Sequence, residues 1–166
     1  MRNGVPQMYV IAGPNGSGKT TSAKTLLPEL LSCNEYVNAD SVAAALSPFN
    51  PDAVAIQAGR LMLERIHYLA DQCVNFAFET TLASRTFITF LEYCKQRGYE
   101  VNILFLWLRT PDIAVQRVKS RVEQGVHDIP QDVILRRYHR SIKNFLIDYT
   151  KIATNWMLYD NSEKHS

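Results

Sequence analysis

The chain has few of the features that mark secreted, membrane-bound or strongly charged proteins. Its 166 residues include three cysteines, Cys33, Cys73 and Cys94, without a CxxC spacing, and the odd number argues against a disulfide framework. No apolar run reaches the length of a membrane span, and the N-terminal one is too short for a signal peptide. The net charge of +2 does not by itself indicate a nucleic-acid or membrane partner. We therefore expect a cytoplasmic protein with inert thiols and neither kind of partner.

Short apolar runs alternate with longer segments of helical periodicity along the whole chain. The runs with the length and composition of strands cover residues 8–12, 36–38, 74–78, 101–108 and 155–159. The helices expected between them end near Pro28, run from Asn50 to Gln72, cover 84–96 and 111–124, and begin again near Gln131. This order predicts a single α/β domain over residues 1–161, with a five-stranded parallel sheet covered on both faces. Only residues 162–166 are expected to be disordered.

A glycine-rich turn, GPNGSGKT at 13–20, lies between the first expected strand and a helix. It satisfies G-x-x-x-x-G-K-[ST] in the strand–turn–helix context that a phosphate-binding P-loop requires. We expect Lys19 to reach the β- and γ-phosphates of ATP and the Thr20 hydroxyl to bind Mg²⁺. The residues expected to bind ATP in this turn are Gly13, Asn15, Gly16, Ser17, Gly18, Lys19, Thr20 and Thr21.

Other P-loop classes leave signatures that this chain lacks. There is no Asn-Lys-x-Asp element of a GTPase and no LSGGQ-like segment of a transporter ATPase. A motor ATPase usually ends an apolar strand with Asp or Asp-Glu, and only Glu79 comes close to this pattern. The remaining class is the small-molecule kinase, which needs a base near the acceptor hydroxyl and a cationic lid over the phosphates.

Two acids follow expected strands at the edge of the sheet where the P-loop lies. Asp40 is predicted to be the catalytic base and to contact the acceptor, and its alternative role is to cap the following helix. Glu79 is expected to orient the acceptor or a water bound to Mg²⁺. Thr80 and Thr81 are expected to hydrogen-bond the acceptor, with capping of the next turn as the alternative.

Arginines on two expected helices indicate a lid over ATP. Arg117 and Arg121 lie one turn apart, and an anion between them would explain this unfavourable spacing of like charges. Arg136, Arg137 and Arg140 follow a loop that contains glycine and proline. We expect Arg121 and Arg137 to neutralise the transferred phosphoryl group, and Arg117 and Arg136 to contact ATP. The alternatives are a solvated basic face and a weak RNA-binding patch.

The combination of these motifs resembles a known protein family. Segments that include MYVIAGPNGSGKTT, EYVNAD, FAFETTLAS, RVKSRVEQGVHDIP and ILRRYHRSIKNF resemble those of the small bacterial zeta-toxin-like ATPases over nearly the whole chain. The resemblance implies a P-loop kinase, and the best-known members phosphorylate UDP-N-acetylglucosamine and are held off by a small helical antitoxin. It also implies that Asp40 is the base, that Glu79 with Thr80 or Thr81 faces substrate and metal, and that Arg121 is a lid arginine together with Arg136 or Arg137.

These observations predict a Mg²⁺- and ATP-dependent kinase for a small-molecule hydroxyl, foremost that of a nucleotide sugar. Arg60, Arg65 and Arg85 are candidate contacts for acceptor phosphates, with surface ion pairs as the alternative. Two other functions stay open. One is a regulatory ATP-binding module that controls docking to protein or RNA, and the other is a toxin with a dedicated antitoxin.

Overall fold

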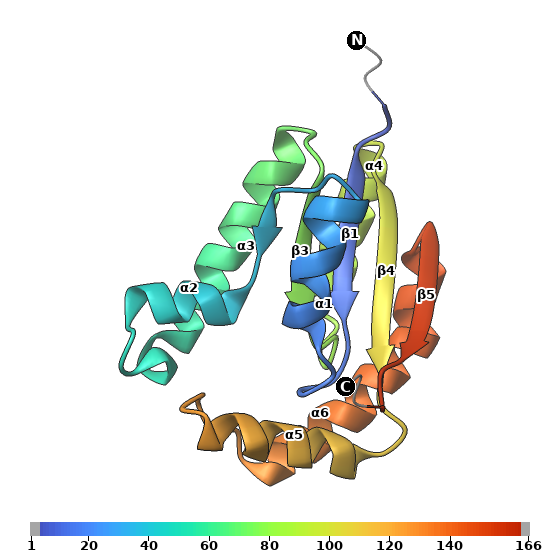
Figure 1. Ribbon diagram of the computed structural model, residues 1–166. Helices are drawn as coiled ribbons and strands as arrows, with labels where there is room; N and C mark the ends of the chain where they lie inside the picture. Colours follow the sequence, from blue (N-terminus) through green and yellow to red (C-terminus); the bar gives the residue numbers. More distant parts are fainter. Residues whose placement is uncertain (1–3, 164–166) are drawn as a thin grey trace.

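Five parallel strands form the sheet of the protein, in the spatial order β2-β3-β1-β4-β5 (Figure 1). The computed structural model describes residues 4–163. The strands are β1 (Gln7–Ala12), β2 (Tyr36–Val37), β3 (Phe76–Thr80), β4 (Glu100–Trp107) and β5 (Asn155–Asp160). All four pairings are parallel, so the predicted five-stranded parallel sheet is confirmed.

Helices connect the strands and lie on both faces of the sheet. Within the described residues they are α1 (Lys19–Thr25), continued by the π-helix η1 (Leu26–Leu30), α2 (Ala39–Leu46), the 3₁₀-helix η2 (Pro51–Val54), α3 (Ala55–Asp71), α4 (Phe87–Gln96), α5 (Pro111–Glu123), α6 (Gln131–Asn144), the π-helix η3 (Phe145–Tyr149) and α7 (Thr150–Ile152). In Figure 1, α1 lies in front of the sheet and α4 behind it, while α5 and α6 lie below the carboxyl ends of the strands.

The central strand β1 contributes to two cores, because its successive side chains point to opposite faces of the sheet. Met8 and Val10 pack in one cluster with side chains of α3, α4 and η3. Ile11 packs on the other face against Ala23 of α1 and Leu27 of η1. A side chain of this size contributes about 1.5–3 kcal/mol when it is fully buried. The turn that follows β1 is therefore anchored by a strand that is buried on both faces.

The helices α5 and α6 have a small core of their own. Val115 and Val118 of α5 pack with Ile134 and Tyr138 of α6. The buried Tyr138 hydroxyl donates a hydrogen bond to the carbonyl oxygen of Leu108 at 2.6 Å, which ties α6 to the residue after β4. These two helices form the helical lid that the sequence predicts, and they lie below the sheet in Figure 1.

The third strand begins and ends two residues later than predicted. Val74 lies in the preceding loop, where its carbonyl oxygen accepts a hydrogen bond from the Tyr99 hydroxyl at 2.7 Å. Ile11 of β1 pairs with Glu79, so this acid lies within the strand and not after it. An apolar run alone does not show such a shift, since polar residues at the end of a buried strand look like the start of a loop.

The predicted boundary at residue 161 is also too early. Ser162 was expected in a disordered tail, but its backbone N–H donates to Asp160 at 3.0 Å. Its hydroxyl oxygen accepts a hydrogen bond from the backbone N–H of Arg109 at 2.8 Å. Glu163 is the last described residue, and residues 164–166 of the expected tail lie outside the described residues.

The three cysteines are free thiols, with Cys33 and Cys94 buried and Cys73 exposed. Burial raises the pKa of the Cys94 thiol to about 12, so little reactive thiolate forms there near neutral pH. None of the helices between residues 4 and 163 is long and apolar enough to cross a membrane.

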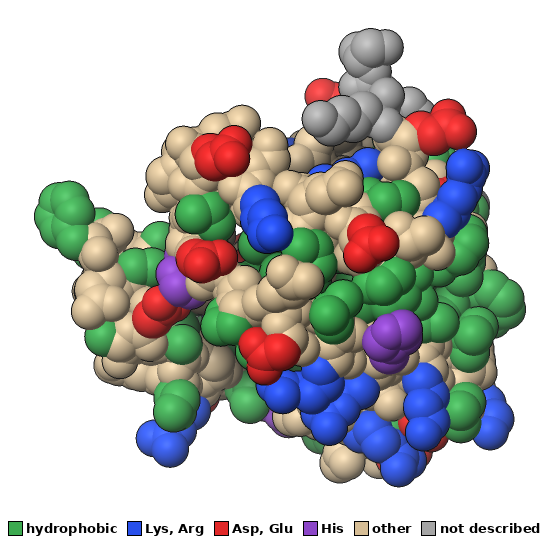
Figure 2. All heavy atoms as spheres, turned by 90° about the horizontal axis from the view of Figure 1, so that it is seen from below, with side chains coloured by type: hydrophobic (Ala, Val, Ile, Leu, Met, Phe, Trp, Pro, Cys, Tyr) green, Lys and Arg blue, Asp and Glu red, His purple; other side chains and the backbone are tan. Residues whose placement is uncertain are grey.

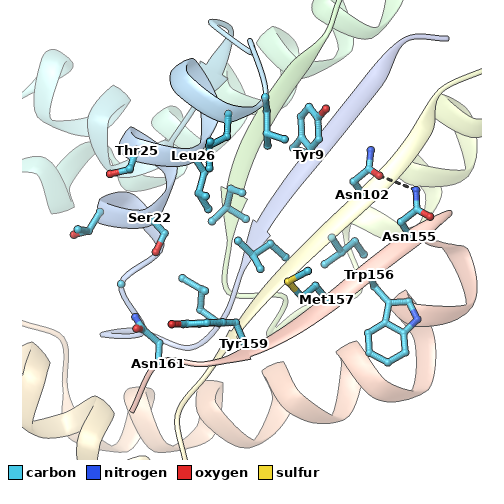
Figure 3. A pocket seen from close by; sticks show the side chains of 18 of the residues that line it. Tyr9, Ser22, Thr25, Leu26, Asn102, Asn155, Trp156, Met157, Tyr159 and Asn161 are labelled. Carbon is cyan, nitrogen blue, oxygen red and sulfur yellow. Dashed lines mark hydrogen bonds between the residues drawn. The ribbon is translucent and has the colours of Figure 1, made fainter. Parts of the chain in front are cut away.

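On the α1 side of the sheet, side chains of α1, η1, β4 and β5 surround a groove (Figure 3). It has a volume of about 930 Å³, with Leu26 on its helical wall and Tyr9 and Met157 on the strands. One end of the groove reaches Gly18 and Asn161 beside the P-loop. The groove is lined mainly by apolar side chains, and its charged lining residues are Arg117 and Glu163.

Candidate functional site

The P-loop joins β1 to α1 and needs glycine for its shape. Gly13 has φ of 145°, and a Cβ atom there would lie 2.4 Å from the carbonyl oxygen of Leu106. Gly18 has φ of 90°, and its Cβ would lie 2.6 Å from the side-chain nitrogen of Asn161. A larger residue at either position would therefore push the loop away from β4 or β5.

Lys19 is buried at the base of the P-loop, and its Nζ donates to the carbonyl oxygen of Pro14 at 3.1 Å. Burial lowers its pKa to about 8, Glu79 opposes this effect, and Arg121 and Arg137 add to it. An ammonium group has three donors, so Lys19 can still reach an anion. Such an anion would also compensate the charge that burial destabilises.

Two buried polar atoms of the P-loop, Asn15 Oδ1 and Ser17 Oγ, have no hydrogen-bond partner among the described residues. Buried polar atoms in folded proteins are rarely left unpaired without a ligand or water. The Ser17 hydroxyl can donate to a phosphate, as can the N–H groups of the turn and the remaining donors of Lys19, whereas Asn15 Oδ1 can only accept, for example from a water. ATP as co-substrate is therefore consistent with the residues present.

Glu79 of β3 accepts hydrogen bonds from three neighbouring side chains. Thr20 Oγ1 lies 2.8 Å from Glu79 Oε2, and Asn38 Nδ2 lies 2.9 Å from the same oxygen. The Tyr36 hydroxyl also donates to this carboxylate. Burial, with a further contribution from Glu79, raises the pKa of the Tyr36 phenol, so it stays a donor. The carboxylate is thus held in one orientation against the P-loop threonine.

Thr20 and Glu79 were predicted to hold Mg²⁺, and their chemistry fits that ion. Mg²⁺ usually takes one or two protein oxygens, with phosphates and waters completing its shell. A hydroxyl oxygen and a carboxylate oxygen lie together here at 2.8 Å. Residues 4–163 contain no group of three or more His, Cys, Asp or Glu side chains able to hold a metal by themselves.

Asp40 lies in the first turn of α2, but it is not the helix cap. That role belongs to Asn38, whose Oδ1 accepts hydrogen bonds from the backbone N–H groups of Asp40 at 2.8 Å and Ser41 at 3.3 Å. The alternative considered for Asp40 is therefore wrong, because the cap falls two residues earlier. The Asp40 carboxylate is left exposed and lines the same cavity as Lys19.

This cavity has a volume of about 370 Å³ and lies between the P-loop, α2 and the lid. The side chains with chemistry in its lining are Asn15, Lys19, Thr20, Thr21, Asp40, Asp52, Glu79, Arg121 and His127. His127 Nε2, in the loop between α5 and α6, lies 2.8 Å from Asp52 Oδ1 of η2. No function was predicted for His127, and in the structure its contact with Asp52 spans the cavity from the lid loop to η2.

The lid arginines occupy different places. Arg121 lines the cavity, whereas Arg117 donates to the carbonyl oxygens of Gly16 at 3.3 Å and Ser162 at 3.0 Å. Arg137 is partly buried and acts on Lys19 through its charge, but it does not line the cavity. Arg136 is exposed and lies outside the cavity lining. From the lid side, Lys and Arg side chains gather in one area of the surface (Figure 2).

Three predicted acceptor contacts lie outside the cavity lining. Thr80 Oγ1 accepts a hydrogen bond from the backbone N–H of Leu82 at 3.1 Å, and Thr81 Oγ1 accepts one from Ala83 at 3.3 Å. Both threonines therefore cap the turn after β3, which was their alternative role. Arg85 is mostly exposed and forms an ion pair with Asp148.

Sequence reasoning missed Asn161, which follows β5. Its side-chain nitrogen donates to the carbonyl oxygen of Ser17 at 2.7 Å, and its backbone N–H donates to Trp107 at 2.9 Å. It also missed Asn38 and Tyr36, the partners of Glu79. The one available signal was their position directly at or after strands whose ends meet at the P-loop edge.

Known proteins of similar sequence include a family with a P-loop and one relative of similar length. The zeta toxin family model matches residues 1–163. An uncharacterized protein of Haemophilus influenzae is 30% identical over 131 residues, which cover 76% of this chain and 88% of that protein.

Solved structures share the fold. A chain of the PezAT chromosomal toxin–antitoxin system of Streptococcus pneumoniae superposes with a TM-score of 0.69 at 15% identity, over 95% of this chain and 69% of that one. Shikimate kinase of Acinetobacter baumannii superposes with a TM-score of 0.55 at 19% identity, over 98% of this chain and 85% of the enzyme. The chain therefore belongs to the zeta toxin family and has the fold of P-loop kinases.

Proposed function

We propose that this protein is a kinase that moves the γ-phosphate of ATP to a hydroxyl group of a small molecule. The observation that carries the proposal is the shared cavity of Lys19, Arg121 and the exposed carboxylate of Asp40. Lys19 and Arg121 are suited to neutralise phosphate charge, and Asp40 faces them from α2. A regulatory ATP-binding module needs the P-loop but has no use for an acceptor base.

In the proposed reaction, the acceptor oxygen attacks the γ-phosphorus while the bond between this phosphorus and the β–γ bridging oxygen breaks. Asp40 orients the acceptor hydroxyl and takes up its proton. Lys19 and Arg121 stabilise the charge on the transferred phosphoryl oxygens. Mg²⁺, held by the Thr20 hydroxyl and oriented by Glu79, would supply further neutralisation of the β- and γ-phosphates. Most of the rate acceleration then comes from positioning and charge.

The identity of the acceptor, an antitoxin partner and a toxic activity are proposed from membership in the zeta toxin family. UDP-N-acetylglucosamine, the acceptor of the best-known zeta toxins, is the first nucleotide sugar to test. The similarity to a chain of a toxin–antitoxin system supports a small antitoxin protein as a partner and a toxic activity in the cytoplasm. If the protein is such a toxin, its expression arrests growth and Lys19→Ala relieves the arrest.

The kinase proposal is tested by incubating the protein with γ-labelled ATP and a metabolite extract. We expect a small molecule to gain label, and Asp40→Asn to lower the rate by about 10²–10⁴-fold because the base is lost. ATP binding, measured by calorimetry, should be nearly unchanged in this variant. Asp112→Asn is the matched control, since Asp112 is an exposed acid on α5 outside the cavity. Absence of label, or an Asp40→Asn rate equal to that of the wild type, would contradict the proposal.

A further inference from the structure

We infer that the groove beside α1 binds a second copy of this chain, so that the protein forms a dimer in which β5 of each copy packs into the groove of the other. The groove is a different site from the phosphate cavity, and the residues that line both are Gly18 and Thr21. The inference concerns assembly of the chain and is independent of the proposed kinase function.

Strand β5 lies at one edge of the sheet and lacks the usual protection of an edge (Figure 1). Residues 155–159 contain neither a charged residue nor a proline, the residue types with which proteins commonly blunt an exposed edge. Trp156, Met157, Leu158 and Tyr159 each expose 40–62% of their surface. Alternate side chains of a strand point to opposite faces, so this edge is apolar on both faces. Exposed apolar surface of this kind marks an interaction site.

The opposite edge of the sheet is protected. Strand β2 there has only two residues, and the ion pair between Arg65 and Glu35 lies directly before it. A short strand and nearby charges are both ways to prevent association through a sheet edge. The contrast between the two edges is expected if a partner covers β5.

The groove has the shape of a step. Leu26 and Leu30 of η1 line its helical side, Tyr9 and Leu104 lie on its floor, and β5 is the strand farthest from α1 (Figure 3). Two identical steps related by a twofold axis fit together, because β5 of one copy enters the groove of the other and meets η1 there. Sheets that pack face to face lie about 10 Å apart, so the second sheet fits into the layer that α1 occupies.

The exposed apolar surface around the groove is large enough for a dimer. Leu30, Trp156, Met157 and Tyr159 line the groove and expose 70%, 52%, 62% and 45% of their surfaces. At about 200 Å² for a side chain of this size, they offer about 450 Å² per copy and about 900 Å² in a dimer. The partly buried side chains of the floor add to this area. The total reaches the roughly 1,000 Å² that a specific interface needs.

The charges of the groove favour a second copy over a partner of different charge. The charged lining residues are Arg117 and Glu163, one of each sign, at the end beside the P-loop. A strongly acidic or strongly basic partner would match only one of them. A second copy brings one cation and one anion of its own, so each charge can face an opposite one.

Sedimentation velocity between about 1 and 100 µM tests the dimer, and we expect a monomer–dimer equilibrium of the wild type in this range. Leu30→Glu and Met157→Lys should each be monomeric, because either change places a charge in the apolar interface. Both residues are exposed, so circular dichroism should show an unchanged fold. Ile56→Glu is the matched control, since Ile56 is 77% exposed on α3 and lies outside the groove, and this variant should associate like the wild type.

A mixture of the two variants tests the arrangement within the dimer. If β5 of one copy meets Leu30 of the other, a mixed dimer has one Glu–Lys contact and one unchanged contact. We therefore expect an equimolar mixture of Leu30→Glu and Met157→Lys to dimerise at least about tenfold more tightly than either variant alone.

Three results would overturn the inference. A wild-type protein that stays monomeric up to about 100 µM would leave the groove to a different protein. A dimer that persists in both variants would place the interface elsewhere. Monomeric variants whose mixture also stays monomeric would rule out the packing of β5 against η1. All three results leave the kinase function untouched, because transfer of label from ATP tests that function separately.

Discussion

Asn38 uses both ends of its amide within the candidate site. Its oxygen caps α2, which carries Asp40, and its nitrogen donates to Glu79 at 2.9 Å and lies 3.4 Å from Thr20 Oγ1. Only 7% of the residue is exposed, so few other partners compete for these groups. One side chain thus joins the helix of the proposed base to the residues that fit Mg²⁺.

Asn38→Ser separates these two tasks. Serine caps a helix about as well as asparagine, but its short hydroxyl does not reach Glu79. We expect the melting temperature to change little, while kcat falls by about 10–100-fold. The factor by which Mg²⁺ strengthens ATP binding should fall by a similar amount. Asn34→Ser, the same change at an exposed position before β2, is the control. A variant that loses stability but keeps its Mg²⁺ dependence would show that Asn38 serves the fold alone.

Lys19 makes ATP binding dependent on pH. Burial lowers its pKa to about 8 in the free protein, so it is mostly neutral above that pH and must take up a proton to hold a phosphate. We expect the dissociation constant for ATP to rise by up to about tenfold per pH unit above pH 8. Calorimetry between pH 7 and 9.5 measures this trend, and Lys19→Met should bind weakly at every pH. A constant affinity across this range in the wild type would contradict the account.

The lowered pKa of Lys19 also makes the stability of the ligand-free protein depend on pH. The unfolded chain keeps Lys19 protonated up to about pH 10.4, whereas the folded chain releases this proton near pH 8. The unfolded state therefore binds more protons between these values, and Lys19 makes the ligand-free protein more stable as the pH rises through this window.

At the scale of elements, an exposed contact between His127 and Asp52 links the lid loop to η2 across the cavity. His127 lies in the loop between α5 and α6, and Asp52 lies in η2 at the start of α3. The small core of α5 and α6 holds the lid together, while this pair links its loop to the far side of the cavity. We therefore expect loss of this contact to affect closing of the lid over ATP more than the stability of the fold.

Asp52→Asn weakens this link with little change of shape. An exposed pair of this kind contributes about 0–1 kcal/mol to the free energy of unfolding, so the melting temperature should stay nearly constant. We expect KM for ATP to rise by about two- to fivefold if the pair favours the closed lid. Asp112→Asn removes a charge from α5 without this contact and should leave KM unchanged. A lower melting temperature at unchanged KM would show that the pair supports the fold instead.

The elements themselves were largely predictable from the sequence, but their exact ends were not. The apolar run of β4 and the P-loop pattern carry strong local signals, and both lie where predicted. The shift of β3 depends on pairing with β1. The cap bonds at Asn38 are local, and what the pattern does not show is that the amide nitrogen of Asn38 reaches Glu79. The strand pairing and the contact with Glu79 are long-range interactions, which local patterns do not encode.

At the scale of the molecule, the strand order brings the site together. β1 lies between β3 and β4, so the P-loop is flanked by the end of β3 with Glu79 and by the end of β4. Asp40 follows β2 and Asn161 follows β5, at the two ends of the sheet. The parallel order made it possible to predict that Asp40 and Glu79 approach the P-loop. The positions of His127 and Asn161 required the packed structure, since no motif surrounds them.

The fate of the γ-phosphate tests the central claim most directly. ATP, Mg²⁺ and a whole metabolite extract, together with each of its fractions, are incubated with the protein, and phosphorus NMR follows the products. The account predicts a new phosphomonoester signal that grows as ADP forms, with little inorganic phosphate. Formation of inorganic phosphate alone, with no phosphomonoester in any metabolite fraction, would contradict the claim that Asp40 and Lys19 belong to a kinase site.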